Sequence, residues 1–165
     1  MIKLLPLIFI FFISSCNNGE INSDREPYIG TVNGYYMDLS IYMLYLEEQI
    51  NIFESEIGTY IWSTNLDGIS TVTLAKSHAL QNMALSILIR DLASSHEIYI
   101  SEEPLTDIQF FEESIRIREE LRGILTEAYA EDQRVEIFGN MEDNWLLSAE
   151  IIRNIEIWDE ITIGE

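Results

Sequence analysis

Basic side chains are scarce in this sequence. Nine Lys and Arg residues stand against 29 Asp and Glu residues, which gives a formal charge of −20 at pH 7. Proteins that bind nucleic acid neutralise phosphates with a patch of Lys and Arg, and so few cations do not provide one. We therefore expect no nucleic-acid partner. The acidic surface should also be repelled by anionic membrane surfaces, because like charges oppose close approach.

Cysteine and histidine are also rare. Cys16 is the only cysteine, so no internal disulfide can stabilise the fold. The two histidines, His78 and His96, fall within or at the end of one predicted helix and are separated by about five helical turns, too far to share a metal ion. The sequence has neither a Gly-x-Ser-x-Gly elbow nor a glycine-rich phosphate loop. We accordingly expect no catalytic residue, no metal and no cofactor.

Long hydrophobic runs are missing as well. A membrane-spanning helix needs roughly 20 apolar residues, whereas the run from Leu4 to Ile13, behind Lys3, has the size of a secretory signal-peptide core. It is followed by Ile13-Ser14-Ser15-Cys16, which resembles a bacterial lipobox. This resemblance implies that residues 1–15 are a lipoprotein signal peptide and that Cys16 receives the lipid. The protein is then expected at the extracytoplasmic face of the cell membrane, held there by its lipid anchor.

A polar segment separates this start from the rest of the chain. The sequence "NNGEINSDREP" contains Gly and Pro and almost no apolar side chains, which is typical of a linker. We expect residues 16–27 to form a flexible tether. Residues 28–165 are rich enough in aliphatic and aromatic side chains to form one folded domain.

The folded domain is predicted to be mainly α-helical. Short apolar runs on both sides of Asn33-Gly34 predict a β-hairpin, because this dipeptide readily adopts the positive φ angles of a tight turn. Apolar residues then recur every three or four positions, which predicts helices. We expect a small N-terminal hairpin followed by about five helices, over 38–57, 70–96, 101–122, 126–139 and 142–158, with turns at Gly58, Asp67-Gly68 and Gly139-Asn140.

The order of turns and caps resembles one family. "TVNGYYMDLSIYMLYL" is similar to the start of the extracytoplasmic foldase chaperones of the SurA and PrsA type, which open with a Val-Asn-Gly hairpin, a cap and an amphipathic helix. Trp62, the Asp67-Gly68 turn, "AKSHAL", "HEIYISEEPLTDIQ" and "GILTEAY" continue the likeness in order over about residues 29–138. Glu97 stands where the family usually has glycine.

This resemblance implies a chaperone module without enzymatic activity. Prolyl isomerases of the family insert a parvulin domain of about 90 residues, the size of an independently folding unit, whereas few residues follow position 138 here. We expect a membrane-anchored holdase-type module that binds unfolded or partly folded exported proteins. Two alternatives remain: a non-catalytic scaffold or adaptor lipoprotein that binds one specific partner, and a truncated foldase.

Tyrosines near the predicted hairpin are candidates for the client surface. Tyrosine offers a large contact area with a polar tip, which suits a surface that holds extended, partly apolar segments. On the helical stripe we expect Tyr42 and Phe53 to be buried. The predicted client-binding residues are therefore Tyr35, Tyr36, Tyr45 and Trp62.

Overall fold

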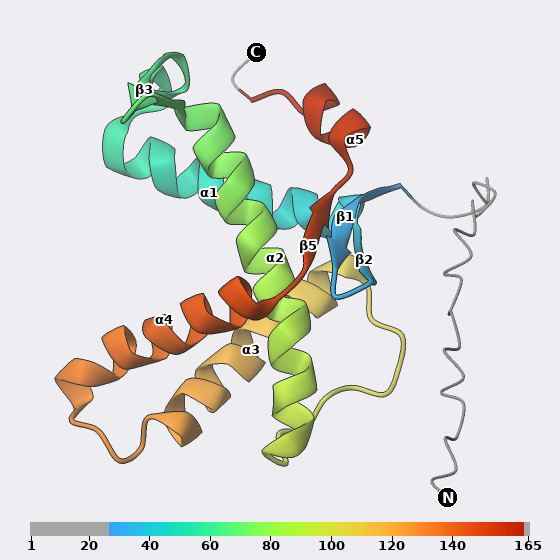
Figure 1. Cartoon of the computed structure of the whole chain (residues 1–165), viewed down its shortest axis with the longest axis vertical. Coiled ribbons are helices and arrows are strands. Elements are labelled where there is room, and N and C mark those ends of the chain that lie inside the picture. Colours follow the sequence, from blue (N-terminus) through green and yellow to red (C-terminus); the bar gives the residue numbers. More distant parts are fainter. Residues whose placement is uncertain (1–26, 164–165) are drawn as a thin grey trace, which may run out of the picture.

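The computed structural model describes residues 27–163. The predicted signal peptide, the lipidation site Cys16 and the predicted tether up to residue 26 lie outside the described residues. Figure 1 shows α2 (Thr71–Ser95) as the central element, with α1 (Leu39–Ile57) crossing its first half and α3 (Asp107–Leu125) and α4 (Glu131–Ser148) lying against its second half.

The sheet joins the two ends of the domain. β1 (Tyr28–Val32) and β2 (Tyr35–Asp38) form the predicted hairpin, in which Asn33 and Gly34 have φ angles of 48° and 83°. The third strand, β5 (Ile151–Arg153), comes from the C-terminal part and pairs antiparallel with β1, so the strand order is β2-β1-β5. The sequence pattern did not predict β5.

The first two helices follow the predicted pattern. α1 (Leu39–Ile57) ends at Gly58, whose φ angle of 100° suits glycine. α2 (Thr71–Ser95) is buried on several sides because α1, α3 and α4 all contact it. Between these helices lie a 3₁₀ turn, η1 (Thr59–Ser63), and two very short strands that close around the Asp67-Gly68 turn; the strands are β3 (Asn65–Leu66) and β4 (Ile69–Ser70).

The third helix starts later than predicted. α3 (Asp107–Leu125) begins after Thr106, whose side chain accepts from the Gln109 N–H at 3.3 Å, while the Gln109 side chain accepts from the Thr106 N–H at 3.0 Å. The prediction of a helix from Ser101 was wrong, because Pro104 disfavours helical geometry in the residue before it. Residues 101–106 are instead a loop.

The C-terminal helices also differ from the prediction. α4 (Glu131–Ser148) runs through Gly139-Asn140, where a break was expected, and the predicted helix over 142–158 is divided between the end of α4, β5 and α5 (Ile155–Glu160). α4 continues because Phe138 and Glu142 lie one turn apart on its buried face: Phe138 joins the core, and Glu142 accepts two hydrogen bonds from Arg118 of α3 at 2.5 and 2.6 Å.

The described part of the chain is mainly helical, with five α-helices and the N-terminal hairpin, which confirms the predicted fold class. The core has two parts on α2. One lies between α1, the first half of α2, the sheet and α5, and the other lies between the second half of α2, α3 and α4. The buried residues of the first part include Ile29, Met37, Tyr42, Leu46, Ala79, Met83 and Trp158; those of the second include Leu85, Ile89, Ile117, Leu121 and Phe138.

The C-terminal segment is fixed to α2 by one lysine. Lys76 is buried, and its ammonium group donates to the carbonyl oxygens of Trp158 and Ile161, the latter at 3.1 Å. It also lies 4.7 Å from the centre of the Trp158 ring. A cation is favoured near the carbonyl end of a helix, so this contact holds α5 in place. Burial lowers the pKa of Lys76 from its ordinary value.

Candidate functional site

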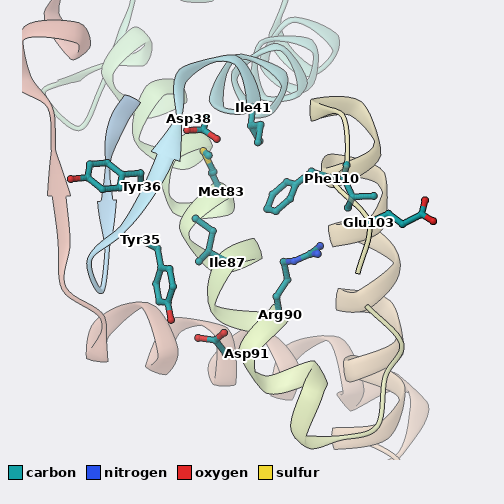
Figure 2. Close-up of a pocket in the computed structure, with 11 residues that line it drawn as sticks. Tyr35, Tyr36, Asp38, Ile41, Met83, Ile87, Arg90, Asp91, Glu103 and Phe110 are labelled. Carbon is teal, nitrogen blue, oxygen red and sulfur yellow. The ribbon is translucent and has the colours of Figure 1, made fainter. Parts of the chain in front are cut away.

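An open cleft of about 440 Å³ lies between the hairpin and α3 (Figure 2). β2 forms one wall, α2 forms the floor with Met83 and Ile87, and Phe110 of α3 forms the opposite wall. The loop before α3 completes the lining. The other lining residues are Tyr35, Tyr36, Asp38, Ile41, Arg90, Asp91, Glu103 and Leu105.

The tight hairpin turn places two of the predicted client-binding residues at this cleft. Tyr35 and Tyr36 directly follow the turn, and both line the cleft with exposed fractions of 56% and 45%. Tyr36 packs edge-on against Tyr28 of β1, with ring centres 4.9 Å apart. Side chains alternate along a strand. Met37, which lies between Tyr36 and Asp38 in the sequence of β2, therefore points into the core and anchors the strand.

The arginine that lines the cleft is bound to an acid behind it. Arg90 pairs with Glu113 of α3 at 2.6 Å and lies 4.9 Å from the centre of the Phe110 ring. Glu113 also accepts from the Ser101 N–H at 2.8 Å. Burial alone would raise the pKa of Glu113, but the hydrogen bonds from Ser101 and Arg90, together with the charges of Arg90 and Arg116, lower it.

The other charged residues that line the cleft are acidic. They are Asp38, Asp91 and Glu103, and the positive charge of Arg90 is balanced by Glu113. Figure 2 shows the Tyr35 ring directed toward Asp91, while Glu103 points outward from the opposite side. The cleft thus combines an apolar floor with an acidic rim, an arrangement that favours an apolar segment carrying positive charge.

A second cleft lies on the neighbouring face of α3. It has a volume of about 550 Å³ and lies between α1 and α3. Phe111 lines it, next to the Phe110 of the first cleft, and packs edge-on against Tyr45 with ring centres 4.8 Å apart. The other lining residues are Leu44, Glu47, Glu48, Asn51, Ile52, Ser55 and Ile108. Consecutive phenylalanines therefore bring two apolar, acid-rimmed clefts to neighbouring faces of one helix.

The other two predicted client-binding residues lie outside this cleft. Tyr45 is only 4% exposed, and its hydroxyl donates to Ser86 Oγ at 2.6 Å, so the prediction that it forms part of the exposed surface was wrong. Its position on α1 faces α2 and α3. Trp62 is half-buried: its indole N–H donates to Glu54 at 2.7 Å and its ring packs on Phe53 at 5.8 Å, away from both clefts.

The sequence pattern missed the contributions of α2 and α3 to the cleft. Ile87, Arg90 and Phe110 come from helices whose apolar positions all predict burial, and nothing local distinguishes a core position from a cleft floor. The nearest signal was Arg90-Asp91, a charged pair within the apolar stretch "LSILIRDLA". Its charges lie where α2 leaves the core and reaches the cleft.

The histidines lie apart, in different surroundings. His78 is exposed on α2 beside Phe53, with ring centres 6.1 Å apart, and His96 follows the last turn of α2. Within residues 27–163, no group of three or more His, Cys, Asp or Glu side chains is arranged to hold a metal ion. None of the helices in that same range is long and apolar enough to cross a membrane.

No protein-family model, no curated protein and no solved structure matches this chain.

Proposed function

We propose that the protein is a lipid-anchored, extracytoplasmic holdase-type chaperone module related to the N-terminal domain of the SurA and PrsA foldases. The observation that carries this proposal is the cleft between β2 and α3, where exposed tyrosines border an apolar floor. Tyrosine and aliphatic side chains together give adaptable contact with many sequences. The ordered turn and cap motifs and the lipobox-like sequence add support from the chain itself.

The shape of the clefts favours weak binding at several points. Both are open at the surface, whereas sites for small molecules enclose most of their ligand. Phe110 and Phe111 bring the two clefts close together on α3. Contacts of modest affinity at neighbouring sites combine when one chain engages both, which suits a module that holds a client and then releases it.

Aggregation of a client tests this function. Residues 17–165, without the lipid anchor, are mixed at stoichiometric amounts with chemically unfolded exported proteins on dilution from denaturant, and light scattering is followed. We expect slower aggregation for several unrelated clients. A lack of effect on every client would overturn the proposal, and an inert protein of similar charge serves as the control.

Isolation of bound proteins separates a chaperone from a scaffold. The full chain is recovered from detergent-solubilised membranes and its bound proteins are identified by mass spectrometry. A broad set of exported proteins supports the holdase function. One dominant partner in stoichiometric amount would instead show an adaptor.

A further inference from the structure

The cleft is bordered by an outer strand of the sheet. β2 stands at one end of the order β2-β1-β5, and no strand within residues 27–163 pairs with its other side. An outer strand presents backbone N–H and C=O groups that can pair with another extended segment. β2 contains no proline and carries the exposed Tyr35 and Tyr36. Extended peptides are commonly bound by addition to such an edge.

The floor of the cleft has the spacing that a strand requires. Met83, Ile87 and Asp91 follow each other at four-residue intervals on α2, and all three line the cleft. Four helical residues rise about 6 Å, and alternate side chains of a strand lie about 6.6 Å apart. Side chains at positions 1, 3 and 5 of an extended segment would therefore lie over these three residues in turn.

The charge of Asp91 indicates which side chain the bound segment carries at position 5. Figure 2 shows Tyr35 beside Asp91 at one end of the cleft, and Met83 toward the other end, nearer Asp38. Asp91 is exposed and forms no ion pair with any residue of the described range 27–163. Figure 2 shows the hydroxyl end of Tyr35 directed toward Asp91, so a cation between them would meet a carboxylate on one side and the tyrosine hydroxyl oxygen on the other.

We propose that this cleft binds an extended segment as an additional strand on β2, with the pattern apolar-x-apolar-x-basic facing α2. The apolar side chains lie over Met83 and Ile87, and a Lys or Arg lies between Tyr35 and Asp91. This inference rests on the proposed function and names the class of client segment that this site recognises. Antiparallel addition, the commoner arrangement, places the basic residue toward the C-terminal end of the segment.

Peptide binding to the full chain, purified in mild detergent, tests the proposed pattern. The probe is a blocked, fluorescently labelled nine-residue peptide with Val-Thr-Val-Thr-Lys at its centre, and binding is measured by anisotropy. Peptides with Gln or Glu in place of Lys are compared with it. We expect the Lys peptide to bind about tenfold more tightly than the Glu peptide, because an acidic rim favours one sign of charge and opposes the other.

Backbone methylation tests the addition of a strand without changing the protein. Alternate residues of an edge-bound strand direct their N–H groups toward β2 and away from it. Two versions of the Lys peptide are N-methylated, one at two odd-numbered and one at two even-numbered positions. We expect one version to lose most of its binding and the other to retain it. Equal affinities for the two would overturn the strand-addition geometry.

A matched pair of variants tests the position of the basic side chain. Asp91→Asn should weaken binding of the Lys peptide about threefold to fivefold, the size of an exposed ion pair, and leave the Gln peptide unchanged. Asp143→Asn removes the same charge from an exposed position on α4 and should leave the affinities for the Lys peptide and the Gln peptide unchanged. Equal effects of the two variants would show that only overall charge matters and would overturn the assignment.

The peptide-binding results can be distinguished from the aggregation test of the proposed function. Slower client aggregation together with equal binding of the Lys and Glu peptides would leave the holdase function standing and overturn this inference. Selective peptide binding without any effect on aggregation would support the site and contradict the holdase function.

Discussion

Tyr45 shows how one side chain can connect three helices. It donates to Ser86 Oγ of α2 at 2.6 Å, Ser86 in turn donates to the Asn82 carbonyl at 3.0 Å, and the Tyr45 ring packs on Phe111 of α3. Burial raises the pKa of Tyr45 from its ordinary value. The phenol therefore stays neutral and continues to donate as the pH passes the ordinary tyrosine pKa of about 10.

Removal of this hydroxyl should destabilise the fold measurably. We expect Tyr45→Phe to lower the free energy of unfolding by about 1 kcal/mol, the typical net contribution of a buried hydrogen bond, as measured by urea denaturation. Tyr60→Phe is the control, because Tyr60 is 66% exposed and should show no change. Equal stabilities for wild type and Tyr45→Phe would contradict the assigned contact.

The Glu113 carboxylate should make stability depend on pH. Its pKa is lower in the folded protein than in the unfolded chain, so the unfolded chain binds more protons near pH 4. The stabilisation is present above the ordinary carboxyl pKa and is lost as the pH falls through the folded-state pKa. We expect the stability difference between wild type and Glu113→Gln to shrink as the pH is lowered from 6 to 3, measured by urea denaturation at each pH.

The neighbouring acid provides a control for this pH dependence. Glu112 is exposed on the same helix, so Glu112→Gln removes the same charge without disturbing the Arg90–Glu113 pair and serves as the matched control. A Glu113→Gln difference that changes with pH no more than the Glu112→Gln difference does would show that the ion pair with Arg90 does not favour the charged carboxylate.

The candidate site could be predicted from the sequence only in part. Tyr35 and Tyr36 were predicted because the Asn33-Gly34 turn fixes their place on a short strand, where they can be exposed. Tyr45 was misassigned because its surroundings depend on Ser86 and Phe111, which are distant in sequence. The same holds for Ile87 and Phe110, since their exposure to a cleft depends on the angle between α2 and α3.

At the level of secondary structure, local signals decided which elements could be predicted. The hairpin, α1 and α2 end or begin beside Asn33-Gly34, Gly58 or Asp67-Gly68, residues that adopt positive φ angles in the structure. β5 has only three residues and forms because β1 lies opposite it, which no local pattern reveals. Likewise α4 passes through Gly139 because Phe138 and Glu142 are held by other helices.

The pairing of β5 with β1 depends on a close approach at Gly30. A Cβ atom at this position would collide with the Ile152 carbonyl oxygen of β5. We expect Gly30→Ala to lower the free energy of unfolding by about 1 to 3 kcal/mol, the usual cost of overpacking. Urea denaturation measures the loss, and hydrogen exchange should show faster exchange of backbone amides in β5.

At Gly123 the same glycine-to-alanine substitution is expected to raise the free energy of unfolding. This glycine lies in α3, and a Cβ atom added there would meet open space, so Gly123→Ala should raise stability by about 0.5 to 1 kcal/mol through helix propensity. Loss of stability in both variants would contradict the role given to Gly30.

At the scale of the whole molecule, charge is the dominant surface property. The chain has a formal charge of −20, and cleavage before Cys16 would remove Lys3 and make it one unit more negative. Acidic side chains line both clefts, including Asp91 in the first and Glu47 and Glu48 in the second. The field of the whole protein and the local charges of the clefts thus have the same sign and favour positively charged binding partners.

Under the proposed holdase function, ionic strength should therefore change the protection of a client in a way that depends on the charge of that client. Screening lengths fall from about 10 Å at 0.1 M salt to about 3 Å at 1 M, so long-range attraction weakens while apolar contact in the clefts persists. For a basic unfolded client, we expect the amount of this protein needed for half-maximal suppression of aggregation to rise severalfold when NaCl is raised from about 0.05 to about 0.5 M. For an acidic client of similar hydrophobicity it should stay constant or fall, because salt screens repulsion there. Light scattering with both clients under matched conditions makes the comparison, and the same salt response for both would show that the acidic surface does not select clients.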